Sequence, residues 1–129
     1  MSARRSRKSK PKMASHATAL VAAQAGASIL VGVLGPVMSI DRSDGYWMSV
    51  VNLVSGAVFA ALVVGLIRNN NTARSLAIAA EALVLTIAVF ELAYTGGSPT
   101  GCFTTFLIAI VLFFLAHPDV RDWYERDRR

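Results

Sequence analysis

Two carboxylates stand inside an apolar segment of this chain. The segment from Arg74 to Tyr94 reads RSLAIAAEALVLTIAVFELAY and is long enough to cross a bilayer, yet it contains Glu81 and Glu91. An acidic side chain at the centre of a membrane-spanning helix costs about 3 kcal/mol, so it normally faces protein or water and marks a functional site. Glu81 is therefore the first candidate for chemistry, as a carboxylate that binds a proton or another cation.

Two other side chains are expected around Glu81. If the helix enters the hydrocarbon near Ser75, Glu81 lies about 9 Å deep. Gln24, in the first apolar segment, reaches a similar depth, so we expect the two side chains to meet. Arg74 precedes Glu81 by two helical turns and is expected to draw the carboxylate toward the cytoplasmic surface. The alternative is a structural role, in which Glu81 is protonated or bonded to Gln24 or Ser28 and orients the helices.

Three further residues are secondary candidates. Glu91 is expected near the outer surface, where its carboxylate reaches water, and the ten residues between it and Glu81 correspond to about 15 Å, too far for a coupled dyad. Asn52 supplies a polar group in the outer half of the second apolar segment. Cys102, the single cysteine, forms either an intermolecular disulfide or a small packing contact between helices.

Motifs for catalysis and for cofactor or metal binding are not found in the sequence. It contains no nucleophile elbow, no phosphate-binding glycine loop and no zinc-type His–Glu spacing. His16 and His117, at the ends of apolar segments, are interpreted as interfacial residues rather than metal ligands. We therefore expect no catalytic residues, no cofactor and no metal, and predict that the protein is not an enzyme.

The composition indicates which elements position these residues. Of the 129 residues, 54% are hydrophobic and only 16% are charged, which is too apolar for an ordinary soluble domain. Four segments come close to the roughly 20 apolar residues that a membrane-spanning helix needs, at about 17–38, 47–67, 75–94 and 100–117. The sequence predicts an all-α polytopic membrane protein with a four-helix transmembrane domain at 16–117, a disordered basic tail at 1–15 and an amphipathic cytoplasmic tail at 118–129.

The placement of the basic residues predicts the orientation. Twelve of the thirteen Lys and Arg residues lie in the N-terminal tail, around the middle loop or in the C-terminal tail, whereas Arg42 lies in an outer loop. Because basic loops stay in the cytoplasm, both termini are predicted to be cytoplasmic in a multi-pass protein of the plasma membrane. The basic N-terminus is expected to contact anionic lipids. Nucleic-acid binding is not expected, because no aromatic or folded element accompanies these charges.

Small residues and turn residues predict how the helices meet. Ala25, Ser28, Gly32 and Gly35 fall on one helical face, and Gly56 with Ala60 repeats the spacing, so we expect a close helix–helix seam. Gly35–Pro36 is expected to kink or end the first helix. Thr72 is expected to cap the third helix. Val120, Trp123 and Tyr124 share one side of a short helix that we expect to lie on the inner membrane surface.

Two strings carry a resemblance to known proteins. GLIRNNNTARSLAIAAEALVL joins the second and third apolar segments, and HPDVRDWYE follows the fourth. Over roughly Trp47 to Tyr124 the chain resembles uncharacterised small four-helix integral membrane proteins of high-GC Gram-positive bacteria, which implies the fold but no activity or substrate. Small multidrug transporters also have four spans, but they carry their essential Glu in the first span, where this chain has Gln24. That difference counts against a transporter.

Two functions follow as expectations. The first is an accessory or interaction protein in the membrane, forming a homo-oligomer or binding a larger membrane partner. The alternative is a small proton- or cation-coupled transporter or channel subunit that uses Glu81.

Overall fold

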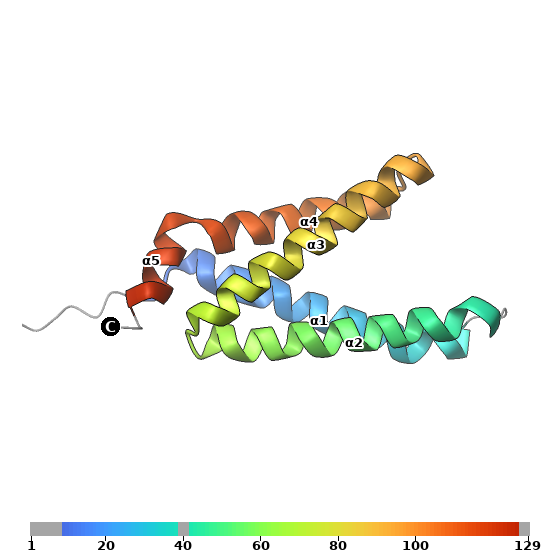
Figure 1. The fold of residues 1–129 in the computed structure, drawn as a ribbon, viewed down its shortest axis with the longest axis horizontal. Coiled ribbons are helices and arrows are strands. Elements are labelled where there is room, and N and C mark those ends of the chain that lie inside the picture. The colour runs from blue at the N-terminus through green and yellow to red at the C-terminus, as the bar shows by residue number, and fades with distance from the viewer. Residues whose placement is uncertain (1–8, 39–41, 127–129) are drawn as a thin grey trace, which may run out of the picture.

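The computed structural model describes residues 9–38 and 42–126. Within these ranges the chain forms five helices: α1 (Lys12–Met38), α2 (Arg42–Ile67), α3 (Asn71–Thr95), α4 (Pro99–Ala116) and α5 (Pro118–Arg126). The first four helices form two antiparallel hairpins, α1–α2 and α3–α4 (Figure 1). The prediction of an all-helical protein is confirmed for the described residues. Three of these helices are long and apolar enough to cross a membrane, or four if the bent pair α4–α5 counts as one span.

The turn between α2 and α3 is built from three asparagines. Asn69 adopts a positive φ of 56°, a conformation that Asn tolerates better than most residues. The side chain of Asn70 caps α3 by accepting a 2.9 Å hydrogen bond from the backbone N–H of Thr72. The expected cap at Thr72 is therefore wrong by two residues, because Asn70 already supplies a side-chain oxygen to the first turn.

The turn between α3 and α4 uses glycine and proline. Gly96 and Gly97 have φ values of 75° and 81°, which L side chains rarely adopt. Ser98 then caps α4 by accepting a 3.0 Å hydrogen bond from the N–H of Gly101, and Pro99 occupies the first helical position, where its missing N–H costs nothing. These residues make the second hairpin tight.

Several predicted boundaries need correction. α1 begins at Lys12, so residues 12–15 are helical and not part of a disordered tail, and residues 1–8 lie outside the described residues. α2 begins at Arg42, inside the loop predicted at 39–46. α1 also continues through Gly35 and ends at Met38. The reason is that the apolar segments predict how much helix lies in hydrocarbon, whereas polar residues continue the helices beyond it.

Glycines bring α1 and α2 into close contact. A Cβ atom added at Gly32 would lie 3.0 Å from the backbone nitrogen of Leu53, and one at Gly56 would lie 3.0 Å from the nitrogen of Ile29. Because backbone atoms move aside less readily than side chains do, these positions favour glycine. The face of α1 that contains Gly32 is therefore the α1–α2 seam, as its small residues indicated.

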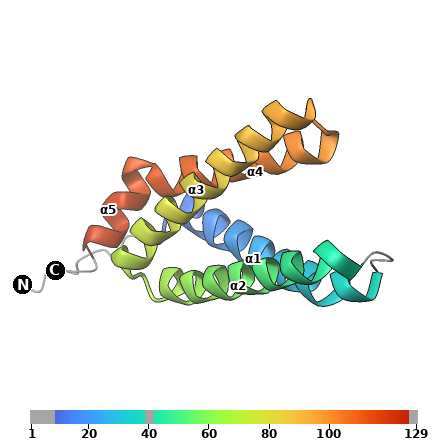
Figure 2. The same cartoon turned by 45° about the vertical axis from the view of Figure 1, so that its right-hand side comes forward.

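The two hairpins share a core at one end and diverge toward the other (Figures 1 and 2). We call the closed end the region where α5, the first turns of α1 and α3 and the α2–α3 turn meet, and the opposite end the open end. Among the residues whose burial is described, the apolar core lies in the half nearer the closed end. It consists of Ala14, Ala17, Val21, Ala25, Phe59, Leu62, Leu66, Ala77, Val111, Leu115, Val120 and Tyr124.

Helix α5 covers the closed end. It follows α4 after a bend of 52° at His117, where the residue before a proline favours an extended backbone. Val120 and Tyr124 are buried in the shared core. The sequence predicted this short amphipathic helix but assigned its apolar side to the membrane surface. In the structure that side packs on the protein itself, because the core would otherwise be open at this end.

Candidate functional site

Glu81 lies at the outer edge of the core. Ala73, Ala77 and Glu81 follow one another at four-residue spacing and share one face of α3, and all three are buried. The alanines allow α3 to approach the bundle closely, so the face that carries Glu81 points inward. Glu81 is 0% exposed and lies about 15 Å along α3 from Asn71. The carboxyl group is thus enclosed by protein.

The structure brings Gln24 and Glu81 together. The amide group of Gln24, on α1, comes near enough to interact with the carboxyl group. Neither Oε1 nor Oε2 of Glu81, however, accepts a hydrogen bond of acceptable geometry from the described residues. Proximity without alignment provides little of the energy of a hydrogen bond. The pair is adjacent, and the carboxyl group is unsatisfied.

Arg74 does not pair with Glu81, contrary to the sequence-based expectation. Its Nη1 donates a 3.0 Å hydrogen bond to the carbonyl oxygen of Leu115, and its Nε donates one of 3.0 Å to Oδ1 of Asn71. The last carbonyl groups of α4 have no partner within their own helix, and they attract a cation. The guanidinium group is therefore used to join α3 to the end of α4. Among the described residues, Glu81 forms no ion pair.

A cavity of about 320 Å³ lies between α1 and α4. Gln24 and Thr104 are the polar residues of its lining, and the rest is apolar: Leu20, Ala23, Ala27, Phe103, Leu107, Ile108 and Val111. Gln24 therefore contacts this cavity and also approaches Glu81. The amide group connects the buried carboxyl group to the space between the hairpins.

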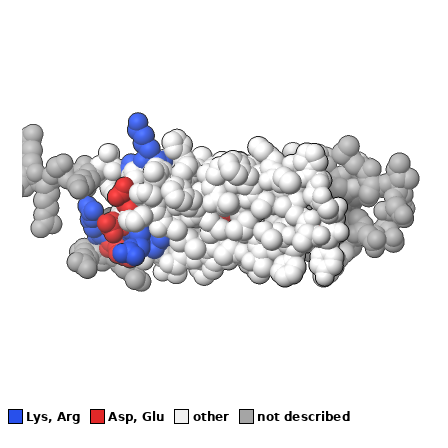
Figure 3. Space-filling model, turned by 90° about the horizontal axis from the view of Figure 1, so that it is seen from above, with Lys and Arg blue, Asp and Glu red and all other residues white. Residues whose placement is uncertain are grey.

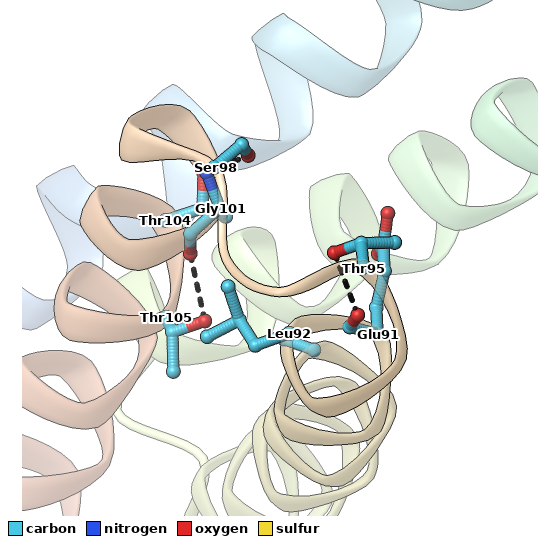
Figure 4. A pocket seen from close by; sticks show the side chains of 8 residues that line it. Glu91, Leu92, Thr95, Ser98, Gly101, Thr104 and Thr105 are labelled. Atoms are coloured by element: carbon cyan, nitrogen blue, oxygen red, sulfur yellow. Dashed lines mark hydrogen bonds between the residues drawn. The ribbon is translucent and has the colours of Figure 1, made fainter.

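Glu91 belongs to a different pocket at the open end. It is exposed and lines a cavity of about 260 Å³ between the end of α3 and the start of α4. Figure 4 shows Glu91 and Thr95 on the α3 side of this pocket and Thr104 and Thr105 on the α4 side. Thr95 and Thr105 each donate a 2.8 Å hydrogen bond to a carbonyl of their own helix. Those hydroxyl protons are therefore not available to a ligand.

The other secondary candidates also lie away from Glu81. Asn52 is half-buried on α2, about 22 Å along the helix from Ile67 and so nearer the open end than the Glu81 level. Cys102 is exposed and free at the start of α4. Within the described ranges, no three His, Cys, Asp or Glu side chains lie close enough together to hold a metal ion.

The closed end contains a set of contacts that sequence reasoning missed. The Tyr124 hydroxyl donates a 3.2 Å hydrogen bond to the carbonyl oxygen of Leu66, and Nζ of Lys10 donates to the same oxygen at 3.4 Å. Nε1 of Trp123 donates to Oδ1 of Asn69 at 3.3 Å. The sequence signal for these contacts was the pair of aromatic residues with a polar tip that follows the end of α4. Such side chains usually find a hydrogen-bond partner when they are buried.

Burial also changes the ionisation of two of these groups. It raises the pKa of the Tyr124 hydroxyl and lowers the pKa of the Lys10 ammonium group, because the charged form of each loses solvation. The ammonium group also lies 5.7 Å from the centre of the Tyr124 ring, where the ring attracts a cation.

None of the protein-family models, curated proteins or solved structures compared with this chain matches it.

Proposed function

We propose that this chain is a multi-pass accessory protein of the plasma membrane, with four spans, both termini in the cytoplasm and no enzymatic chemistry. Its role is to bind another membrane protein, or a second copy of itself, through the open end.

The distribution of charge supports the proposed orientation. Lys, Arg, Asp and Glu side chains gather at the closed end, and most of the other described surface in this view carries no charge (Figure 3). The cations there come from Lys10, Lys12, Arg68, Arg121 and Arg126. Basic residues beside membrane-spanning helices are retained on the cytoplasmic side, so the closed end belongs in the cytoplasm.

The divergence of the two hairpins is the observation that carries the proposed role. In lipid, helices associate through packing and hydrogen bonds and gain nothing from hiding apolar surface from water. Exposed apolar side chains alone therefore do not indicate a partner. Hairpins that pack in one half and diverge in the other (Figure 2) give up helix–helix packing at the open end, and the buried residues of α3 extend no farther than Glu81 in the described part of the helix.

Photocrosslinking in intact cells tests this role. Ile87 and Leu76 lie eleven residues apart on α3, which is three helical turns, so they face nearly the same side. They are 59% and 56% exposed, but Ile87 lies toward the open end and Leu76 toward the closed end. A photoreactive residue at Ile87 is expected to give a discrete protein adduct, and the same residue at Leu76 is expected to give none. Absence of protein adducts at both positions contradicts the proposal.

A small proton- or cation-coupled transporter is the second candidate. It is favoured by the buried, unsatisfied carboxyl group of Glu81, because intramembrane acidic residues mark ion pathways. Proton-driven flux across reconstituted vesicles that is lost in Glu81→Gln and kept in Glu91→Gln favours the transporter. Vesicles without such flux leave the accessory role in place.

A further inference from the structure

We propose that the Glu81 carboxyl group is a proton-binding site that keeps the two hairpins together when protonated and lets them separate when it ionises. The proposal rests on the geometry around Glu81 and requires neither transport nor a partner protein.

The carboxyl group is placed where its charged form is unstable. Glu81 is 0% exposed, and neither carboxyl oxygen accepts a hydrogen bond from the described residues. Removing a carboxylate from water costs several kcal/mol unless a cation or several donors compensate. A protonated carboxyl group is neutral and loses much less. The closed arrangement therefore binds the proton and disfavours the ion.

Among the described residues, no charged group on the neighbouring helices compensates Glu81. Besides the loss of solvation, the interaction that acts on the carboxyl group is that of the Gln24 amide on α1. At this level the buried residues of α2 and α4 are apolar: Phe59 and Leu62 on α2, and Ile108 and Val111 on α4. On α3 itself, Arg74 directs its guanidinium group to Leu115 and Asn71. Within the part of the chain that the structure describes, Glu81 therefore has neither a cation nor a second carboxylate beside it.

These surroundings favour a proton over a metal ion. Ca²⁺ takes six to eight oxygen ligands, and Mg²⁺ requires a nearly octahedral set. The described residues offer one carboxyl group and one amide at this position, and they contain no cluster of metal-ligating side chains. A proton needs a single oxygen.

Glu81 also lies where the hairpins begin to part. Among the described residues it is the buried residue of α3 farthest from the closed end. Ala25 on α1, Phe59 on α2 and Ile108 on α4 are the corresponding outermost buried apolar residues. Beyond this level the hairpins diverge (Figure 2). A small further separation would thus expose the carboxyl group before it disturbed the rest of the core.

Gln24 provides the connection to the space between the hairpins. It approaches Glu81 and also lines the cavity of about 320 Å³ between α1 and α4. Most of that lining is apolar, and a stable buried water needs two to four polar partners. This cavity is therefore a poor place for an isolated water molecule, and proton exchange occurs when the hairpins move apart.

The direction of the pH effect follows from linkage. A ligand shifts a protein toward the state that binds it more tightly, and the closed state binds the proton of Glu81 more tightly than an open, hydrated state. Acid therefore favours the closed arrangement, and raising the pH favours separation of the hairpins at the open end.

A distance measurement between the hairpins tests the proposal. Cys102 on α4 and Trp47 on α2 lie on different hairpins toward the open end, and Trp47 is 69% exposed. The full chain carrying Trp47→Cys is spin-labelled at both cysteines, placed in lipid vesicles and measured by pulsed electron paramagnetic resonance across a pH series. The distance distribution is expected to shift to longer values as the pH rises.

Two variants and a second readout make the test decisive. Glu81→Gln is expected to keep the short distance at every pH, which also shows that it folds, and Glu91→Gln, on the same helix, is expected to shift as the unsubstituted protein does. Infrared spectroscopy should show a protonated carboxyl band that disappears over the same pH range and is missing in Glu81→Gln. A distance that does not depend on pH, a shift that persists in Glu81→Gln, or a carboxyl band that is unchanged over that range overturns the proposal.

Discussion

The carbonyl oxygen of Leu66 accepts three hydrogen bonds at the closed end: one from the backbone N–H of Asn69 and two from the side chains of Tyr124 and Lys10. It belongs to the last turn of α2, where carbonyl groups have no partner within the helix. A residue of α5 and a residue that precedes α1 thus complete the end of α2. Single side chains connect three parts of the chain at this point.

Replacing Tyr124 by Phe removes one of these donors and keeps the ring. We expect the free energy of unfolding to fall by about 1 kcal/mol, because a buried neutral hydrogen bond contributes roughly that amount. Reversible denaturant unfolding in mixed micelles measures the change. Tyr94→Phe is the matched control, since Tyr94 is 88% exposed on α3 and its variant should unfold as the unsubstituted protein does. Equal stabilities of the two variants would show that the Leu66 contact contributes nothing.

At the scale of elements, the two hairpins are held in different ways. α1 and α2 meet backbone to backbone at Gly32 and Gly56, whereas α3 and α4 meet through side chains such as Leu92, which lies against Gly101. The first hairpin is therefore sensitive to any added atom at its seam.

Gly56→Ala tests the α1–α2 seam. The new Cβ would lie 3.0 Å from the nitrogen of Ile29 and 3.2 Å from the carbonyl oxygen of Ala25. Because backbone atoms must shift, we expect a loss of about 1–3 kcal/mol, typical of overpacking. Gly26→Ala, where nothing lies within 4 Å, should be neutral or slightly stabilising because Ala favours helix. The seam assignment fails if Gly56→Ala is as stable as Gly26→Ala.

The helices could be predicted from local sequence patterns. The contacts between helices could not, because they depend on residues that are distant in the sequence. The apolar segments and their turn residues depend on short stretches of sequence, so the four long helices and the short amphipathic helix were predictable. Glu81 could be singled out as a carboxylate in an apolar segment, and its neighbour Gln24 by depth. The hydrogen-bond partner of Arg74 could not be predicted from the sequence. It is the backbone carbonyl of Leu115, 41 residues away, and a backbone carbonyl has no sequence signature.

At the scale of the molecule, the charges gathered at the closed end distinguish it from the opposite end and define one axis (Figure 3). The proposed orientation predicts that a membrane-impermeant thiol reagent labels Cys102 in intact cells. In a Cys102→Ser background, a cysteine at Arg126 is expected to react only after the cells are permeabilised, because it lies at the closed end. The reverse pattern of labelling would refute cytoplasmic termini.

The contacts of α5 also bear on how the protein is made. α5 emerges from the ribosome after the four longer helices, and the proposed four-span arrangement has each of these insert in turn as it is synthesised. The glycine seam lets α1 and α2 associate early, since both sides of that seam are already present. The closed end cannot be completed at that stage, because its buried Val120 and Tyr124 have not yet been translated. In the proposed four-span arrangement, Glu81 therefore enters the membrane before the core beside it is complete, and α5 closes the bundle as the last of the described helices to be made.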